Sequence, residues 1–293
     1  MVKKSRLIVT GSSGRVGQAI CAAAASTFDV IGIDRLPGPT TSVIGDVTNY
    51  DDLARAFAGA QAVIHSAGLH APHVNTVPDC EFQKVNVVGT LTVAKAAIAA
   101  GTARIIFTST TALYGAKTEA NGAAEWINAS AKPKPRTIYH FTKIKAEECL
   151  AEVACRSLHV TILRIARCFP ESPQLMALYR LHRGIDIRDV ASAHLRALQI
   201  EGAQLSTHIV SATTPFLLKD CETLGNNALS VIQKRCPGIV QAFRERGWTL
   251  PRTIDRVYDN SDARLSLKWK PQFGYEAVLS MLDDEITDGL PRG

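Results

Sequence analysis

A glycine-rich turn joins the first strand-like run of the chain to its first helical pattern. The run Arg6–Thr10 is mostly apolar, and the helical pattern begins at Arg15. The turn and the start of the helix contain Gly11, Gly14 and Gly17. A strand, a glycine-rich turn and a helix in this order are typical of the first unit of a parallel sheet with crossover helices.

The first two thirds of the chain repeat this alternation of strand and helix. The strand-like runs are rich in Val, Ile and Phe and alternate little with polar residues, as expected for strands covered on both faces. The expected strands are Arg6–Thr10, Asp29–Asp34, Thr41–Gly45, Ala62–Ser66, Ala103–Ser109, His159–Ile165 and Thr207–Ser211. The expected helices are Arg15–Ser26, Asp51–Ala58, Asp79–Ala100, Thr137–Ser157, Arg188–Ile200, Lys219–Lys234 and Tyr275–Thr287. The pattern predicts an α/β fold with a doubly wound parallel sheet of the Rossmann type.

The glycine-rich turn also predicts a binding site for a dinucleotide. Glycine lets the backbone approach a pyrophosphate closely, and the N-terminus of the following helix faces its negative charge. Asp34 ends the second expected strand, where a carboxylate would accept hydrogen bonds from ribose hydroxyls and repel a 2′-phosphate. The neighbouring Arg35 could bind that phosphate instead. We therefore expect NAD as the cofactor, with NADP as the less favoured alternative.

A tyrosine and a lysine, Tyr139 and Lys143, are spaced to act together. They are four residues apart in the expected helix Thr137–Ser157, so they share one face of it. A nearby ammonium favours the phenolate and lowers the pKa of the tyrosine from its usual value of about 10. Such a tyrosine can accept a proton from an alcohol while hydride leaves the same carbon.

Two features suggest how the chain is divided. Residues Gly115–Arg136, which include Pro133 and Pro135, predict a long active-site loop, and the regular alternation fades from Ala212 onward. We expect an NAD(P)-binding Rossmann domain over 1–166, with 184–212 returning to it. The remaining segments, 167–183 and 213–293, would form a small substrate-binding lobe.

Several segments resemble, in the same order, motifs of the extended short-chain dehydrogenases/reductases, the NAD-dependent epimerase/dehydratase family. These segments are residues 10–17, 45–47, 65–68, 86–90, 107–115 and 259–271. The resemblance spans nearly the whole chain. It implies an NAD(P)-dependent enzyme that forms a homodimer through the helices expected over Asp79–Ala100 and Thr137–Ser157.

The resemblance also implies roles for individual residues. Thr110 would orient the substrate oxygen toward Tyr139, and Lys143 would additionally bind the nicotinamide ribose. Ser109 and Thr111 are the alternatives to Thr110, because neighbouring residues of a strand point to opposite faces. The implied cofactor-binding residues are Gly11, Ser13, Gly14, Arg15, Val16, Gly17, Asp34, Arg35, Asp46, Val47, Ser66, Ala67, Gly68, Asn86, Thr108, Tyr139 and Lys143.

The segment that follows the strand ending near Arg164 is short. Relatives that act on nucleotide sugars usually carry several dozen additional residues there, whereas residues 164–171 are similar to the corresponding segment of uronate dehydrogenases, which oxidise free sugar acids. Arg167, Arg180 and Arg183 lie in this region and could bind a substrate carboxylate or phosphate, or could form a solvated basic face.

Further residues could contact the substrate or stabilise the fold around it. His70 and Thr111 are additional candidates for substrate contact. A metal site is not expected, because His70 and His73 have no carboxylate or cysteine partner at ligand spacing. Arg188 and Asp189 are expected to form a structural charge pair at the start of a helix.

Composition limits the remaining function classes. The formal net charge is +6, but there is no long basic run or nucleic-acid-binding motif, so a small anionic molecule is a better expected partner than a nucleic acid. No apolar run approaches the roughly 18–20 residues of a membrane span. The seven cysteines show no Cys-x-x-Cys motif and no zinc spacing, so we expect reduced thiols in a cytoplasmic protein.

Three functions remain compatible with the sequence. The leading hypothesis is an NAD-dependent oxidoreductase that acts on a hydroxyl or hemiacetal of a small, polar and anionic substrate such as a sugar acid. The second is a sugar or nucleotide-sugar epimerase of the same family. The third is a regulator that senses NAD(P) without catalysis, although such proteins often lack the tyrosine or the lysine that this chain retains.

Overall fold

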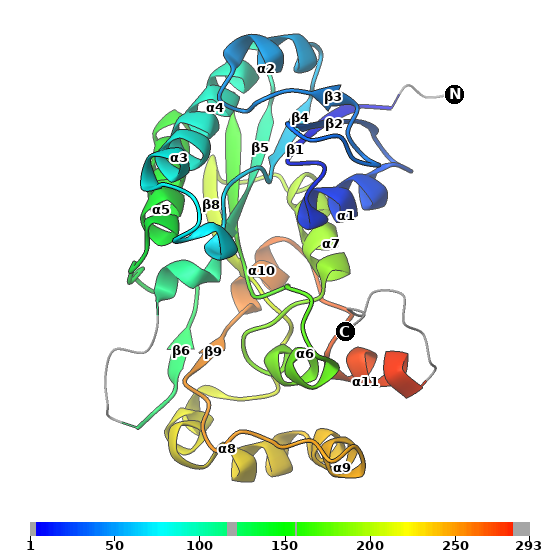
Figure 1. The fold of residues 1–293 in the computed structure, drawn as a ribbon, viewed down its shortest axis with the longest axis vertical. Helices are drawn as coiled ribbons and strands as arrows, with labels where there is room; N and C mark the ends of the chain where they lie inside the picture. The colour runs from blue at the N-terminus through cyan, green and yellow to red at the C-terminus, as the bar shows by residue number, and fades with distance from the viewer. Residues whose placement is uncertain (1–3, 116–121, 156, 284–293) are drawn as a thin grey trace. The chain divides into compact units, whose positions relative to one another are not determined.

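The computed structural model of the protein describes residues 4–115, 122–155 and 157–283 (Figure 1). The chain divides into two compact units. The first consists of Met1–Gly115, Pro133–Arg164 and Val190–His208, and the second of Ala116–Lys132, Ile165–Asp189 and Ile209–Gly293. Among the described residues, no helix combines the length and the apolar composition needed to cross a bilayer.

A seven-stranded sheet forms the centre of the first unit. Its strands are β1 (Arg6–Thr10), β2 (Asp29–Asp34), β3 (Val43–Ile44), β4 (Ala62–His65), β5 (Arg104–Thr110), β7 (His159–Ile165) and β8 (Leu205–Val210). They are arranged in the order β3-β2-β1-β4-β5-β7-β8, and β1 pairs in parallel with both β2 and β4. Because the chain proceeds outward from β1 in both directions, the sheet is doubly wound, which confirms the predicted fold class.

Helices cover both faces of this sheet (Figure 1). They are α1 (Arg15–Ala24), α2 (Tyr50–Ala56), α3 (Asp79–Phe82), α4 (Gly89–Ala99), α5 (Ile138–Val153) and α7 (Ile187–Ala197). Strand residues such as Ile8, Val63 and Ile105 are fully buried with Leu53 and Phe57, and these residues belong to the core that holds the layers together.

The helix expected over Asp79–Ala100 is not uniform. It consists of α3, a π-helical segment over Gln83–Val88, and α4. A π segment widens one turn of a helix and is frequently found at functional sites. Here it contains Asn86, one of the predicted cofactor residues.

The second unit has its own apolar core. Its elements are β6 (Glu125–Ile127), α6 (Pro173–Arg180), α8 (Cys221–Arg235), α9 (Pro237–Glu245), β9 (Arg256–Tyr258), α10 (Ser261–Ser266) and α11 (Tyr275–Asp283). Phe216, Leu224 and Phe243 are among its buried residues. The helix expected to continue to Thr287 is observed as far as Asp283, and the rest lies outside the described residues.

The expectation of a continuous loop over Gly115–Arg136 is wrong for its middle part. Residues 116–121 lie outside the described residues, but β6 pairs in parallel with β9 from Glu125↔Arg256 to Ile127↔Tyr258. Three residues are too few to show a strand period, and the partner strand is more than a hundred residues away, so the local pattern contained no signal for this pair.

The structure gives Arg188 a partner other than the predicted Asp189, at the predicted start of a helix. Arg188 pairs with Asp186 at 2.9 Å, and its guanidinium lies 3.6 Å from the centre of the Phe273 ring. Asp189 instead accepts hydrogen bonds from the backbone N–H groups of Gln272 and Phe273. Neighbouring residues of a helix point in different directions, which separates the two charges.

Candidate active site

The predicted cofactor residues gather at one edge of the sheet. They follow β1 (Gly11, Ser13, Gly14, Arg15, Val16, Gly17), end β2 (Asp34, Arg35), follow β3 (Asp46, Val47), follow β4 (Ser66, Ala67, Gly68) or lie near the end of β5 (Thr108). The carboxyl ends of parallel strands meet at the same edge, and ligands of doubly wound sheets bind there. The fold therefore brings together segments that are widely separated in the sequence.

The glycine-rich turn is packed so tightly that two positions admit no side chain. Gly11 has a φ of +74°, and a Cβ placed on it would lie 2.6 Å from the backbone nitrogen of Ala67. A Cβ on Gly17 would collide with the carbonyl oxygen of Gly11. These contacts set the path of the chain from β1 into α1.

Gly14, in contrast, has space around it. A Cβ there would meet only the carbonyl oxygen of Gly11, at 3.3 Å. Gly14 is also the N-cap of α1, where no side chain caps the helix and the first turn contains no acidic residue. A ten-residue helix with no acidic residue in its first turn and no side-chain cap at its N-terminus fits a pyrophosphate.

Asp34 is held in place at the end of β2. Its carboxylate accepts hydrogen bonds from the backbone N–H groups of Ser13 and Leu36, both at 3.0 Å. A carboxylate has about four lone-pair sites, so it can also accept from ribose hydroxyls. Arg35 is 55% exposed in its side chain and lies 4.0 Å from Asp46. These residues and the turn together fit a dinucleotide.

Asn86 fastens the loop after β4 to α5. Its side-chain oxygen accepts from the N–H of Leu69 at 2.8 Å, and its amide donates to the carbonyl oxygen of Leu69 and to the hydroxyl of Thr142. In the same loop, the hydroxyl of Ser66 donates to the carbonyl oxygen of Thr10 at 2.7 Å. These bonds link the loop to β1, the π segment and α5.

Tyr139 and Lys143 lie on α5, where they are 8% and 6% exposed. The ammonium of Lys143 donates to the carbonyl oxygen of Thr108 at 2.7 Å, and its nitrogen lies 4.0 Å from the centre of the Phe107 ring. Burial lowers the pKa of Lys143 to about 7, while the carboxylate of Glu147 acts in the opposite direction. The amine is therefore fixed in position and sensitive to its electrostatic surroundings.

Three consecutive hydroxyls at the end of β5 have different partners. Thr108 bonds to Nε2 of His194 at 2.8 Å, and Ser109 donates to Glu147 at 2.5 Å. The hydroxyl oxygen of Thr110 accepts from the N–H of Ala112 at 3.0 Å. Because Thr110 accepts in that bond, its own hydroxyl hydrogen can be donated to a substrate oxygen.

The tautomer of His194 follows from its two bonds. Its Nδ1 lies 2.7 Å from the carbonyl oxygen of Val190, which can only accept, so Nδ1 carries the hydrogen. Nε2 therefore accepts from the hydroxyl of Thr108. The side chain of Thr108 is thus bound to His194 while its carbonyl oxygen receives Lys143, which anchors the end of β5.

Sequence reasoning missed Glu147 and Arg164, which form a buried ion pair close to Lys143. Glu147 is 7% exposed and Arg164 is 9% exposed, and their closest atoms are 2.6 Å apart. The four-residue spacing from Lys143 to Glu147 was a signal for a shared helix face. No local signal linked Glu147 to Arg164 on β7.

The three arginines predicted to bind substrate belong to the second unit and differ from one another. Arg167 is committed to Glu171, with nitrogen–oxygen distances from 2.6 to 3.0 Å. Arg180 is 8% exposed, and its Nη2 lies 3.3 Å from Asp186 while its Nη1 has no hydrogen-bond partner among the described residues. Arg183 stacks over the ring of Tyr179 at 4.4 Å, and its buried Nε has no hydrogen-bond partner in the part of the chain that the structure describes.

The other candidates for substrate contact lie in the first unit. His70 is exposed in the loop after β4, and its Nδ1 lies 3.1 Å from Nδ1 of His73. Thr111 is 4% exposed and begins the 3₁₀ turn Thr111–Tyr114.

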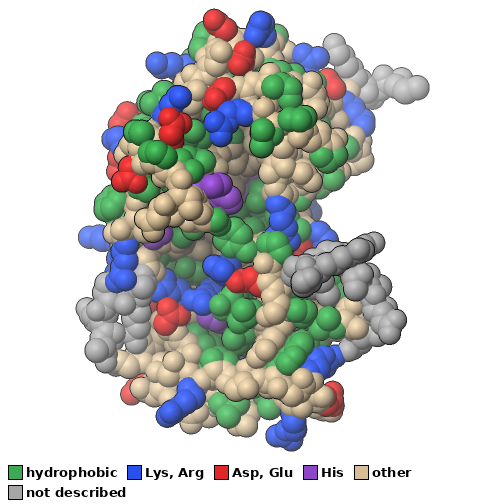
Figure 2. Space-filling view, in the orientation of Figure 1, with side chains coloured by type: hydrophobic (Ala, Val, Ile, Leu, Met, Phe, Trp, Pro, Cys, Tyr) green, Lys and Arg blue, Asp and Glu red, His purple; other side chains and the backbone are tan. Residues whose placement is uncertain are grey.

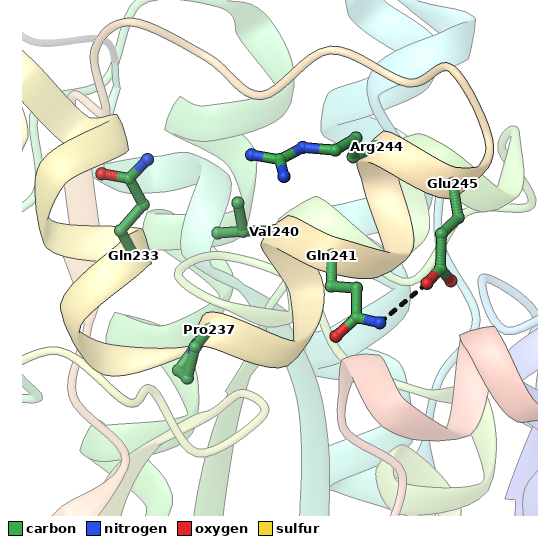
Figure 3. A pocket seen from close by; sticks show the side chains of 6 residues that line it. All are labelled: Gln233, Pro237, Val240, Gln241, Arg244 and Glu245. Carbon is green, nitrogen blue, oxygen red and sulfur yellow. Dashed lines mark hydrogen bonds between the residues drawn. The ribbon is translucent and has the colours of Figure 1, made fainter.

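A shallow hollow of about 440 Å³ lies on α8 and α9, and it contains none of the predicted site residues (Figure 3). It is lined by Gln233, Pro237, Val240, Gln241, Arg244 and Glu245. Figure 3 shows Gln241 turned toward Glu245, to which it donates a hydrogen bond of 2.8 Å. On the face of the first unit drawn in Figure 2, acidic and basic side chains are interspersed, as on an ordinary solvated surface.

Comparison with known proteins identifies the family. Residues 7–176 match the model of the NAD dependent epimerase/dehydratase family. The L-arabinose 1-dehydrogenase (NAD(P)(+)) of Haloferax volcanii is 34% identical over 155 residues, which are 49% of this chain and 59% of that enzyme. The chain thus spans little more than half the length of that relative, and a smaller share of some other curated proteins that it matches.

Two longer similarities agree with this assignment. The UDP-glucose 4-epimerase of Rhizobium meliloti is 24% identical, with 94% of this chain and 95% of the epimerase covered. A short-chain dehydrogenase/reductase superfamily protein of Agrobacterium tumefaciens, solved with bound NAD, has the same fold, with a TM-score of 0.71, 20% identity, and 97% and 98% of the two chains covered. The chain therefore belongs to the NAD-dependent epimerase/dehydratase family, and its fold is that of a short-chain dehydrogenase/reductase protein.

Proposed function

We propose that the protein is an oxidoreductase that oxidises a hydroxyl or hemiacetal carbon of a small, polar and anionic molecule such as a sugar acid. The observation that carries this proposal is the arrangement around α5. Tyr139 and Lys143 are buried one helical turn apart, and Lys143 is bonded to the strand that ends at Thr110. A general base, a cation that tunes it and a hydroxyl donor are the groups that alcohol oxidation needs.

Each residue has a distinct part in the proposed reaction. The hydroxyl of Thr110 donates a hydrogen bond to the substrate oxygen and orients it. The phenolate of Tyr139 accepts the proton of that oxygen, and the ammonium of Lys143 favours the phenolate over the phenol. NAD supplies the hydride acceptor when it is bound. The glycine-rich turn and Asp34 hold the dinucleotide, as their geometry favours.

The size of the segment between β7 and α7 supports a small substrate. Between Ile165 and Ile187 the chain forms one eight-residue helix, α6, so this segment offers little chain to enclose a nucleotide. The similarity to a dehydrogenase of the free sugar L-arabinose agrees with this choice.

Two guanidinium groups support an anionic substrate. Arg180 and Arg183 each keep one buried nitrogen without a hydrogen-bond partner within residues 4–115, 122–155 and 157–283, and a buried unsatisfied donor is costly. A carboxylate is the natural acceptor for such donors. Arg167 is the weakest of the three candidates, because Glu171 already pairs with it through two nitrogens.

The direct test measures NADH formation with sugar acids, their neutral parent sugars and a UDP-sugar. We expect NADH with sugar acids, and we expect Arg183→Ala to raise the KM for them by about 10- to 100-fold, as loss of a charged hydrogen bond should. Arg244→Ala is the matched control, because Arg244 is an exposed arginine of the same unit. Equal use of acidic and neutral sugars, or rapid turnover of the UDP-sugar, would contradict this substrate class.

The alternative is a sugar or nucleotide-sugar epimerase. It is favoured by the similarity to a UDP-glucose 4-epimerase, which extends over 94% of the chain. The same Tyr139 and Lys143 would serve both reactions, but an epimerase interconverts isomers without net formation of NADH. Chromatography of the sugar products beside the NADH measurement separates the two activities.

We also propose a homodimer formed through α4 and α5. Three large apolar side chains on or beside these helices, Val88, Ile98 and Phe141, are 48–52% exposed. Burying them against a second copy would remove apolar surface from water. We expect sedimentation to show a dimer at micromolar concentration and Ile98→Glu to shift it toward the monomer. A monomeric parent protein would exclude this interface.

A further inference from the structure

Glu147 continues the line of functional residues on α5 by one more turn, since Tyr139, Lys143 and Glu147 are spaced four residues apart. We propose that Glu147, clamped by Arg164, is a positioning residue that keeps Lys143 in its charged form and fixed one helical turn from Tyr139. This inference rests on the proposed function and adds to it a residue that does not touch the substrate.

The carboxylate of Glu147 is held by three donors. Arg164 donates to one oxygen through Nε at 3.1 Å and to the other through Nη2 at 2.6 Å, and Ser109 donates to the first oxygen at 2.5 Å. Arg164 is held in turn by the hydroxyl of Tyr114 at 2.9 Å. Three donors on its two oxygens hold this buried carboxylate in one orientation.

Lys143 depends on a nearby anion because it is buried. Burial disfavours the ammonium, and Glu147 is the group whose charge opposes that effect. The other ionisable groups around this part of the site include Tyr139 on α5, His65 on β4, His70 in the loop after β4, His194 on α7, and Tyr114 and Arg164 beside Glu147. None of these groups is a carboxylate, so none can take the place of Glu147 beside Lys143.

The same carboxylate also ties α5 to the end of β5. Ser109, which donates to Glu147, stands between Thr108 and Thr110. Thr108 presents its carbonyl oxygen to Lys143, and Thr110 presents its hydroxyl for the substrate. Because Ser109 is bonded to Glu147, the residues on either side of it, Thr108 and Thr110, are also held in position. Glu147 therefore helps to position both the ammonium of Lys143 and the hydroxyl of Thr110.

The test removes the negative charge of residue 147 and keeps a side chain of similar size. Glu147→Gln keeps the length of the side chain and one acceptor oxygen, enough for Ser109 and Nε of Arg164, but it removes the negative charge and the acceptor of Nη2. Without the carboxylate, Lys143 loses its proton more readily, and the phenolate of Tyr139 is then less favoured. The pKa of Tyr139 should therefore rise, and the acidic limb of the kcat/KM profile should move to higher pH. We expect a shift of about one pH unit, which lowers kcat/KM on that limb roughly tenfold.

A second readout needs no turnover. Titration of tyrosinate absorbance in the cofactor-free protein, taken as parent minus Tyr139→Phe, reports the ionisation of Tyr139. Its midpoint should rise in Glu147→Gln by the same amount as the kinetic limb. If the parent turns over no substrate, the proposed function fails, yet this midpoint still tests the role of Glu147.

Two comparisons separate charge from packing. Glu147→Asp keeps the carboxylate and should restore the parent midpoint, whereas Glu148→Gln removes an exposed carboxylate one residue away and should leave the midpoint unchanged. If Glu147→Gln fails to fold, Glu147→Gln/Arg164→Gln removes both buried charges and should show a smaller upward shift, because loss of the guanidinium favours the ammonium of Lys143. A folded variant without the carboxylate that keeps the parent profile and midpoint would overturn the proposal.

Discussion

Replacing Tyr139 with phenylalanine should abolish turnover while leaving the affinity for NAD nearly unchanged. The substitution removes the oxygen that accepts the substrate proton and keeps the buried ring, which is 8% exposed in the parent. A general base typically contributes about 10²–10⁴-fold to the rate, so kcat should fall by at least about 100-fold. Steady-state assays in both directions, with NAD binding followed by fluorescence, would measure the two quantities.

The affinity for NAD serves as the internal control in this experiment. We assign most of the dinucleotide contacts to the glycine-rich turn and Asp34, which the substitution does not touch. A variant that binds NAD normally and retains activity within about tenfold of the parent would rule out Tyr139 as the base. Loss of both binding and activity would instead indicate damage to the fold.

Gly17→Ala should destabilise the protein, whereas Gly14→Ala should leave stability nearly intact and weaken NAD binding. The Cβ of an alanine at position 17 would collide with the carbonyl oxygen of Gly11. Both positions belong to the backbone of the turn, which cannot move aside as a flexible side chain can. Overpacking of this kind costs about 3 kcal/mol of unfolding free energy. Urea denaturation of both variants and the parent would measure the difference.

Gly14 is the matched control, because its backbone conformation, with φ −73° and ψ 157°, suits alanine. Its Cβ would meet a single protein atom at 3.3 Å, so a shift of a few tenths of an ångström is enough to accommodate it. The same methyl group would occupy the space beside the glycine-rich turn in which we expect the pyrophosphate to bind. We therefore expect at least about a tenfold loss of NAD affinity. Equal stability of the two variants would contradict the packing argument, and unchanged NAD affinity in Gly14→Ala would contradict the placement of the dinucleotide.

The strands and helices of the first unit were predictable because apolar runs and helical patterns are local features of the sequence. The runs Arg6–Thr10 and His159–Ile165 were predicted with the observed bounds. Short apolar runs alternating with helical patterns can pack stably only as a parallel sheet with helices on both faces, so element order was enough for the fold class. The boundaries of helices shifted by a few residues, as they do where the last turn has few tertiary contacts.

The strand pair β6 and β9 shows where local patterns stop being informative. Each strand has three residues, and the parallel register from Glu125↔Arg256 to Ile127↔Tyr258 exists only because the second unit brings distant segments together. The partner of Arg188 was missed for a similar reason. Its adjacency in sequence to Asp189 suggested a pair, but the helix directs the two side chains apart, and Asp186 is the residue in reach.

The sequence by itself determined the α/β class, the glycine-rich turn and the shared helix face of Tyr139 and Lys143. Each of these depends on spacing within one or two neighbouring elements, where backbone geometry dictates the outcome. Only the tertiary structure decided the partners of the buried polar groups. Arg164 reaches Glu147 across 17 residues of sequence, and His194 reaches Thr108 across 86. A buried polar group must find a partner, but which partner it finds depends on which elements become neighbours in the packed fold.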